Sequence, residues 1–153
     1  MKLDVLIFSC ENNVYALPVG SVVHVIRALE ITSIPESSPI LYGVFDLQGI
    51  MTPVISSREL FSLPKKDLDP EDVLIILQVY GYQIALLADH VNGVFELEEE
   101  NLNEVEELFE GIVATHTVKW EDHLAPVLDI QRLIDQETAK YLAQKKREDN
   151  VFT

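Results

Sequence analysis

Cysteine is nearly absent from the sequence, and this limits how the fold can be held together. Cys10 is the only cysteine among 153 residues, so the chain can form no internal disulfide and no cysteine-based metal cluster. A chain of this length buries about 68–70% of its unfolded surface, which is enough to fold without either kind of cross-link. The sequence therefore predicts one domain or two small fused lobes around an apolar core.

Basic residues are missing from the middle of the chain. No lysine or arginine lies between Asp67 and Val118, yet this stretch holds half of the acidic residues, and the net charge is −15. Eight of the glutamates crowd together: Glu96, Glu98, Glu99, Glu100, Glu104, Glu106, Glu107 and Glu110. Such a negative field repels phosphate backbones and argues against nucleic-acid binding. We expect a solvated loop or short helix there, with a surface for a basic partner as the alternative.

Long hydrophobic runs are also missing. The apolar run "VLIIL" at 73–77 is far shorter than the roughly 20 residues of a membrane-spanning helix. Residues 1–10 do not resemble a secretory signal, because Asp4 interrupts the apolar run and no small-residue cleavage site follows. The expectation is a soluble, cytoplasmic protein with no direct membrane insertion.

The sequence has no clear set of catalytic or metal-binding residues. Its histidines do not have zinc-protease spacing; they are His24, His90, His116 and His123. His116 and His123 could meet across one hairpin, which is the weak alternative for a metal site. Cys10 is expected to be an inert core thiol, and Asp89-His90 a turn. We expect no catalysis, metal or cofactor; a small hydrolase using a serine, His90 or Cys10 is the alternative.

An internal repeat of about 70 residues is the most informative feature that is present. The segment at 5–26 resembles 73–95, and the segment at 43–60 resembles 111–133. Most matched positions in the first pair are 69 residues apart; Gly43 is matched with Gly111, and Pro53 with Pro126 after a longer second hairpin. This period is too long for a solenoid unit and indicates duplication of a small lobe.

Each copy is predicted to contain five strands. Short β-branched and apolar runs alternate with turn residues, and five strands can close into a small barrel that hides its edges. The predicted organisation is a single domain over residues 1–153. It has lobe one at about 1–61, a charged linker at about 62–72, lobe two at about 73–128 and a C-terminal helix at about 129–147.

Two helix starts are predicted from capping residues. Residues 56–59, "SSRE", have the capping-box pattern and open a one-turn helix through Phe61. Asp129 is a candidate N-cap for the C-terminal helix. Its apolar face is expected to pack across a lobe and consists of Ile130, Leu133, Ile134, Tyr141 and Leu142.

These segments together resemble the CheW family of chemotaxis coupling proteins over about residues 3–134. The strongest stretch is "VVHVIRALEITSIPESSPILYGVFDLQGIMTPVISSRELFSLP", and "ALLADHVNGVFEL" and "APVLDIQRLI" match the family's second half. The motifs are individually weak, but their order and spacing are specific. The resemblance implies a mostly β fold of two SH3-like five-stranded barrels with a C-terminal helix.

The resemblance also implies a function in two-component signal transduction. It implies a cytoplasmic, non-catalytic scaffold that joins the regulatory domain of a CheA-type histidine kinase to the cytoplasmic tip of methyl-accepting chemoreceptors, at membrane-associated arrays. In the family, the receptor helix binds in the groove between the barrels, and the barrel ends contact the kinase. An adaptor for a non-flagellar chemosensory pathway is the alternative within this fold.

The chain departs from the family pattern at a few positions. Gln48 replaces the family's arginine, Asp46 its asparagine, His24 its glutamate and Ser56 its aspartate. We expect His24 and Gln48 to lie on neighbouring strands and to share a neutral hydrogen bond in place of an ion pair. The predicted partner-binding residues are Val22, His24, Arg27, Gly43, Asp46, Gln48 and Gly49.

Overall fold

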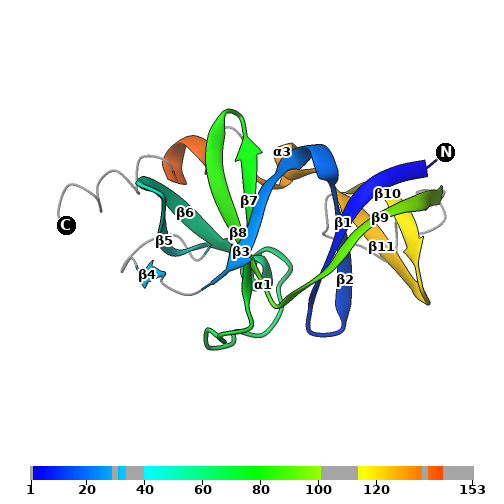
Figure 1. Ribbon diagram of the computed structural model, residues 1–153, viewed down its shortest axis with the longest axis horizontal. Coiled ribbons are helices and arrows are strands. Elements are labelled where there is room, and N and C mark those ends of the chain that lie inside the picture. Colours follow the sequence, from blue (N-terminus) through cyan, green and yellow to red (C-terminus); the bar gives the residue numbers. More distant parts are fainter. Residues whose placement is uncertain (1, 29–30, 34–39, 101–113, 136–137, 143–153) are drawn as a thin grey trace.

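Two β-sheets lie side by side in the computed structural model, which describes residues 2–28, 31–33, 40–100, 114–135 and 138–142 (Figure 1). One sheet is a closed five-stranded barrel. In order around the barrel, its strands are β1 (Lys2–Cys10), β2 (Asn13–Pro18), β11 (His123–Leu128), β10 (Ala114–Trp120) and β9 (His90–Glu100). This confirms the prediction of a mostly β fold with a five-stranded barrel.

The other sheet has six strands where five were predicted. In sheet order they are β3 (Val22–Arg27), β7 (Val73–Val79), β8 (Tyr82–Ala88), β6 (Ile50–Ser56), β5 (Leu41–Leu47) and β4 (Thr32–Ser33). The edge strands β3 and β4 follow one another in the chain. Short helical elements are η1 (Val19–Ser21), α1 (Ser57–Leu60) and α3 (Ile130–Leu133).

The two sheets exchange strands between the two halves of the sequence. The hairpin β1–β2 of the first half takes β9 of the second half as its neighbour, and the hairpin β7–β8 takes β3 of the first half. The sheets therefore do not follow the predicted division into lobes at 1–61 and 73–128. A lobe built from consecutive strands would have paired β3 with β1 and β9 with β7. Instead β3 and β9, which we call the crossing strands, each pass to the other sheet and link the two sheets into one unit.

The repeat itself appears in the irregularities of the crossing strands. The register of β3 on β7 skips Val23, and that of β9 on β1 skips Asn92. These β-bulges are 69 residues apart, the predicted offset. The second copy does not have the predicted longer hairpin, because β5–β6 and β10–β11 both close with two residues. By strand register, Gly43 corresponds to His116; Gly111 lies outside the described residues.

Apolar side chains form three cores. One fills the barrel and includes Val5, Ile7 and Val118, and a second lies on one face of the six-stranded sheet around Val54 and Leu74. The third and largest core lies between the two sheets. Among its members are Phe8, Leu17, Ile75, Leu77, Leu86 and Ile134. This intersheet core fixes one sheet against the other and so shapes the surface where the strands cross.

Both predicted helix starts are confirmed. The Ser56 side chain accepts a hydrogen bond from the Glu59 backbone N–H at the start of α1. The Asp129 side chain accepts one from the Arg132 backbone N–H at the start of α3. The predicted continuous helix over 129–147 is wrong, because α3 ends at Leu133 and Ile134 has a non-helical backbone, with φ −119° and ψ 89°.

The C-terminal segment packs on the intersheet core, as predicted. Residues 138–142 are helical again, and the Asp135 side chain accepts a hydrogen bond from the Thr138 N–H. Ile130, Ile134 and Leu142 are buried in this core. The break at Ile134 lets two short helices contact the core. Residues 143–147 lie outside the described part of the chain.

Candidate functional site

Three of the predicted partner-binding residues lie on the crossing strand β3. Val22 is half-buried against the intersheet core, while His24 and Arg27 are exposed. The Arg27 guanidinium lies 3.6 Å from the Glu71 carboxylate, and both side chains face solvent. Such an exposed pair contributes little to stability, so Arg27 is available for a partner.

The other four predicted residues lie on the β5–β6 hairpin. Gln48 and Gly49 form its two-residue turn with φ values of 51° and 89°, which is the left-handed pair that a type I′ turn requires. The Asp46 carboxylate accepts a hydrogen bond of 2.8 Å from the Gly49 N–H. The polar pair Asp46 and Gln48 is therefore explained by turn geometry, with the Gln48 side chain left exposed.

Gly43 has a different structural role. It is buried in β5, and a Cβ atom there would lie 2.3 Å from the Thr32 carbonyl oxygen and 2.8 Å from Ile31 Cγ2. Only glycine lets β4 approach β5 this closely. The predicted role of Gly43 as a partner contact stays a prediction.

The predicted pairing of His24 with Gln48 is not supported by the sheet order. β3 pairs with β7, whereas β5 pairs with β4 and β6, so the two strands are not hydrogen-bonded neighbours. No hydrogen bond joins His24 and Gln48 in the part of the chain that the structure describes. The expectation was wrong because burial alternation gives a strand's faces but not its neighbours.

Four valines extend the intersheet core toward solvent, and sequence reasoning had singled out only the first as a contact. Val22 and Val25 of β3 pair with Leu77 and Ile75, and Val91 and Val94 of β9 pair with Phe8 and Leu6; all four partners belong to that core. Residues that pair across antiparallel strands project to the same face.

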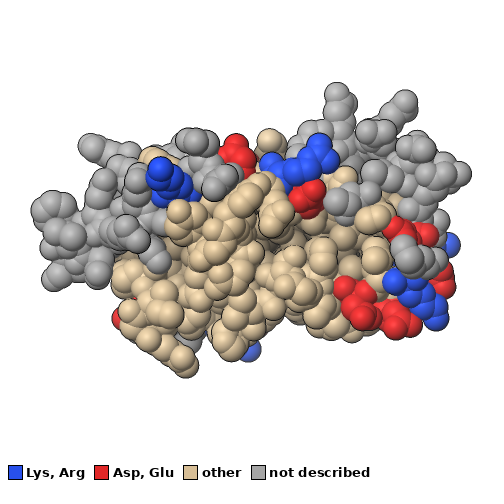
Figure 2. All heavy atoms as spheres, turned by 90° about the horizontal axis from the view of Figure 1, so that it is seen from above, with Lys and Arg blue, Asp and Glu red and all other residues tan. Residues whose placement is uncertain are grey.

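The outer two of these four residues, which we call the intersheet valines, are exposed. Val25 is 40% and Val94 is 62% exposed. They are equivalent by the 69-residue offset, so the repeat presents an apolar side chain from each crossing strand. In the view of Figure 2, charged side chains gather at the barrel end, and the middle carries few among the described residues. Exposed apolar side chains that continue a core are suited to docking a partner.

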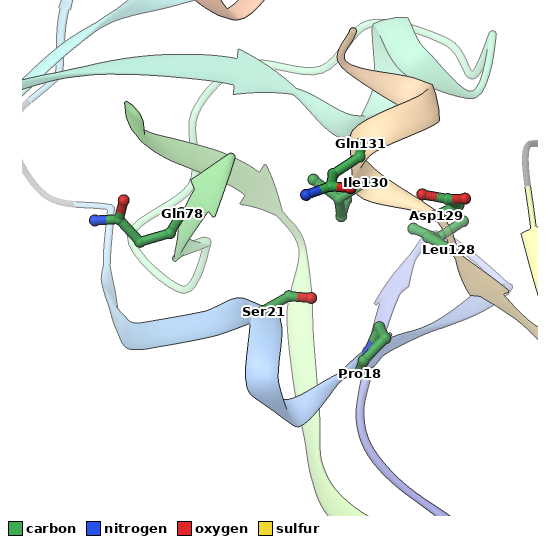
Figure 3. Close-up of a pocket in the computed structure, with 7 residues that line it drawn as sticks. All are labelled: Pro18, Ser21, Gln78, Leu128, Asp129, Ile130 and Gln131. Carbon is green, nitrogen blue, oxygen red and sulfur yellow. The ribbon is translucent and has the colours of Figure 1, made fainter. Parts of the chain in front are cut away.

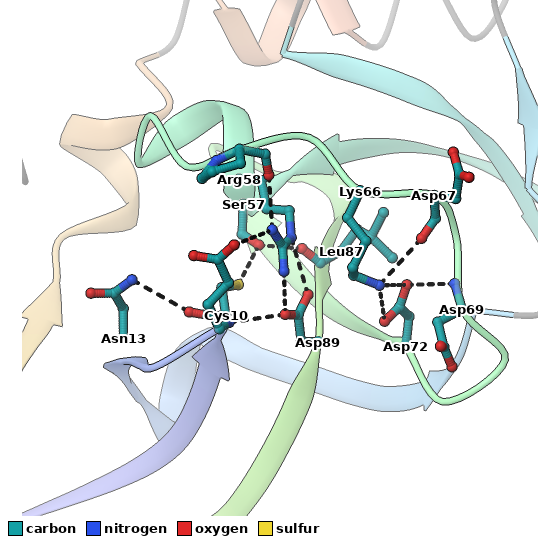
Figure 4. A network of polar contacts seen from close by, with 12 residues as sticks. Cys10, Asn13, Ser57, Arg58, Lys66, Asp67, Asp69, Asp72, Leu87 and Asp89 are labelled. Carbon is teal, nitrogen blue, oxygen red and sulfur yellow. Dashed lines mark hydrogen bonds and ion pairs between the residues drawn. The ribbon is translucent and has the colours of Figure 1, made fainter.

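A partly buried ion-pair network ties the two sheets together (Figure 4). Arg58 of α1 donates from Nε to Asp89 Oδ1 at 3.3 Å and from Nη2 to Asp89 Oδ2. Its Nη1 reaches Glu11 Oε1 at 3.0 Å, and the Glu11 N–H donates to Asp89 at 2.9 Å. Glu11 lies at the tip of the β1–β2 hairpin and Asp89 precedes β9. The network therefore clamps the barrel to the six-stranded sheet, and sequence reasoning missed it.

The ionisation of Asp89 should make this junction sensitive to acid. Burial raises the pKa of Asp89, but the hydrogen bonds from Arg58 and from the Glu11 N–H, with the nearby Arg58 charge, outweigh it and lower the pKa. A carboxyl group whose pKa is lower in the folded state stabilises the fold. This stabilisation is complete when the pH is above the unfolded-state pKa, about 4, and it is lost as the pH falls below that value.

We therefore expect the free energy of unfolding of wild type to fall more steeply below about pH 4 than that of Asp89→Asn. Urea unfolding at several pH values measures this. Asp67→Asn, at an exposed linker position, is the matched control and should follow wild type. If the free energy of unfolding falls equally steeply with pH for wild type and Asp89→Asn, the ionised Asp89 does not stabilise the junction.

The cysteine and histidine side chains that the sequence offered as reactive or metal-binding groups do not form a common site. Cys10 is fully buried with its Sγ 2.8 Å from Ser57 Oγ, and burial raises the pKa of this thiol, so the nucleophilic thiolate is disfavoured. This confirms the prediction that Cys10 is a core thiol.

The two histidines that could have met across one hairpin do not pair. His116 approaches Glu99 at 2.6 Å, while His123 stacks on Trp120, and the two histidines are not cross-strand partners. The described residues contain no cluster of three potential metal ligands.

Comparison with known proteins gives one consistent family. The family model described as CheW-like domain matches residues 4–138. The chemotaxis protein CheW of Bacillus subtilis is 26% identical over 141 residues, with 88% of each chain covered. The chemotaxis protein CheW of Thermotoga maritima is 26% identical over 141 residues, which cover 91% of this chain and 92% of that protein.

A solved structure shares the fold. The scaffolding protein TtCheW from Thermoanaerobacter tengcongensis superimposes with a TM-score of 0.77 at 23% identity, over 90% of this chain and 96% of that chain. No helix among the described residues is long and apolar enough to cross a membrane.

Proposed function

The chain belongs to the CheW-like family of chemotaxis adaptors, and from this premise we propose that it joins the regulatory domain of a CheA-type histidine kinase to the cytoplasmic tip of chemoreceptors. The observation that carries the proposal is the family match over residues 4–138. The adaptor acts in the cytoplasm and reaches membrane-associated receptor arrays through its partners.

The receptor contact is proposed at the intersheet valines. In the family, as the resemblance implies, the groove between the barrels holds the receptor helix. Here Val25 and Val94 supply exposed apolar side chains next to the intersheet core. An amphipathic helix could bury its apolar face on them.

The kinase contact is proposed at the outer ends of the two sheets. The β5–β6 hairpin is such an end, and it exposes Gln48, Gly49 and Ile50 beside Asp46. A rigid hairpin turn presents these residues without a large ordering cost on binding. The adaptor itself is proposed to be non-catalytic, which agrees with the buried Cys10 thiol and its raised pKa.

A negative charge placed at either intersheet valine should weaken receptor binding. Val25→Glu or Val94→Glu is expected to reduce affinity for a receptor-tip fragment about tenfold or more, because a carboxylate would be desolvated in an apolar contact. Fluorescence anisotropy with a labelled fragment measures this. Leu68→Glu places the same charge at an exposed linker position and should bind as wild type. Equal affinities for all three variants would locate the receptor contact elsewhere.

The residue at position 48 should affect partner choice more than folding. Gln48→Arg restores the family's residue on an exposed turn and is expected to change affinity for the kinase regulatory domain or the receptor fragment severalfold. The melting temperature should stay within about 2 °C, because surface substitutions change stability by roughly ±0.5 kcal/mol or less. A large loss of stability would show that Gln48 serves the fold.

A non-flagellar pathway is the second candidate within the same fold. It is favoured by the loss of both family charges, at His24 and Gln48, which changes the charge pattern offered to partners. Pull-down with kinase and receptor fragments from the two kinds of pathway separates the candidates. Preference for the flagellar set would reject the second.

A further inference from the structure

The internal repeat creates two comparable junctions between the sheets. At the first, Arg58 of α1 reaches Glu11 at the β1–β2 hairpin tip. At the second, the Gln131 carbonyl of α3 accepts a hydrogen bond of 2.9 Å from Tyr80 Oη at the β7–β8 hairpin tip. Gln131 follows Pro126 by as many residues as Arg58 follows Pro53, so the two positions correspond.

The second junction lacks the ion pair that fills the first. Gly20 corresponds to Asp89 by the 69-residue offset, and Gln131 stands in place of Arg58. A cavity of about 230 Å³ lies at this junction (Figure 3). It is lined by Pro18, Ser21, Gln78 of β7 and residues 128–131. Gln131, the equivalent of Arg58, lines this cavity, and the lining residues Pro18 and Ser21 lie on either side of Gly20, the equivalent of Asp89, in the sequence.

The lining of this cavity suits a guanidinium. The Asp129 carboxylate, the Gln131 side chain and the Ser21 hydroxyl can accept hydrogen bonds, whereas the Gln78 amide points away from the other lining residues in Figure 3. The volume is below the roughly 300–1,000 Å³ of small-molecule sites, so it fits one long side chain better than a whole ligand. We propose that this cavity receives the arginine side chain of a partner protein, in the place that Arg58 occupies at the first junction.

Asp129 can serve this site while it caps α3. Its Oδ1 accepts from the Arg132 N–H at 3.3 Å, and a carboxylate has further lone pairs for a guanidinium. No basic side chain among the described residues forms an ion pair with Asp129. The net charge of −15 adds a long-range attraction for a basic partner.

Titration with a small arginine probe tests the chemistry without a partner protein. N-acetyl-L-arginine amide should shift the backbone amide NMR signals of Ser21, Gln78 and Gln131. The corresponding lysine amide should bind at least threefold more weakly, because an ammonium lacks the planar fork of donors. The uncharged citrulline amide, which has a similar shape, should bind at least fivefold more weakly.

Matched variants locate the probe. Asp129→Asn removes the charge but keeps a good helix cap, and should weaken binding at least fivefold. Asp135→Asn makes the same change at the cap beside Thr138, outside the cavity, and should bind as wild type. The double variant Gly20→Asp with Gln131→Arg should fill the cavity from within and abolish binding. A Cβ at Gly20 meets nothing within 4 Å, so this change is tolerated.

The proposal is overturned if the probe shifts none of these amides, if the citrulline amide binds equally well, or if Asp129→Asn binds as wild type. Because the probe is a free amino-acid derivative, these outcomes do not depend on whether the chain binds a kinase or a receptor.

Discussion

Replacing Arg58 with alanine is expected to lower the free energy of unfolding by about 2–3 kcal/mol. The Arg58 side chain is only 11% exposed, and its removal leaves Asp89 mostly buried with no guanidinium partner. It also removes the hydrogen bonds to Glu11 and to the Pro64 carbonyl. Urea unfolding at pH 7 measures the loss, with Arg58→Lys expected to lie in between because lysine offers no bidentate fork.

Arg27→Ala is the matched control for this effect. Arg27 also pairs with a glutamate, but its side chain is 62% and that of Glu71 79% exposed, so its removal should cost less than about 0.5 kcal/mol. Equal losses for Arg58→Ala and Arg27→Ala would show that the junction network does not hold the sheets together. A further sign of the clamp would be faster hydrogen exchange in the β1–β2 hairpin of Arg58→Ala.

Replacing Gly43 with valine is expected to lower the melting temperature by about 5–10 °C, which corresponds to roughly 2–3 kcal/mol for a chain of this size. A Cβ there would lie 2.3 Å from the Thr32 carbonyl oxygen, which is backbone and cannot rotate away. The substitution must therefore push β4 from β5, where Thr32 pairs with Val44 and Ser33 with Gly43. Thermal unfolding followed by circular dichroism measures the shift.

Gly20→Ala is the control, because a Cβ there has open space around it and the backbone needs no left-handed conformation. It should change the melting temperature by less than about 2 °C. If Gly43→Val melts like wild type, β4 can move away from β5 at no cost, and the close approach is not what selects glycine.

Local features of the fold were predictable from the sequence. Hairpins, strand alternation and the capping residues Ser56 and Asp129 depend on residues close together in the chain, so their patterns are visible in a short window. The repeat was also visible, and the bulges at Val23 and Asn92 bear it out. Family resemblance then gave the fold class, which the structure confirms.

The exchange of crossing strands was not predictable in this way. Val5 pairs with Phe95 and Arg27 with Val73, and such distant pairings leave no mark in the local hydrophobic pattern. A lobe of consecutive strands and a lobe that takes a strand from the other half of the chain bury the same residues. The predicted C-terminal helix was too long for a related reason: Ile134 fits a helical face, but α3 ends at Leu133 and the Asp135 side chain caps a separate helical segment.

The candidate site was predictable only in part. The sequence singled out β3 and the β5–β6 hairpin, but the expected contact between His24 and Gln48 depended on a neighbourhood that the sheet order does not provide. The Arg58–Asp89 network was missed although both residues stand in stretches that match the family. An acidic hairpin tip at Glu11 gave no signal of its own, because its partners are 47 and 78 residues away.

Co-assembly of three components tests the proposed adaptor function: this chain, a CheA-type kinase regulatory domain and a receptor-tip fragment. Analytical ultracentrifugation of pairs and of the full mixture gives the masses of the complexes. We predict that the chain binds each partner separately and that the mixture contains a ternary complex, which Val94→Glu loses while its kinase complex persists. If the chain binds neither partner, or binds only one at a time, it is not an adaptor between kinase and receptor.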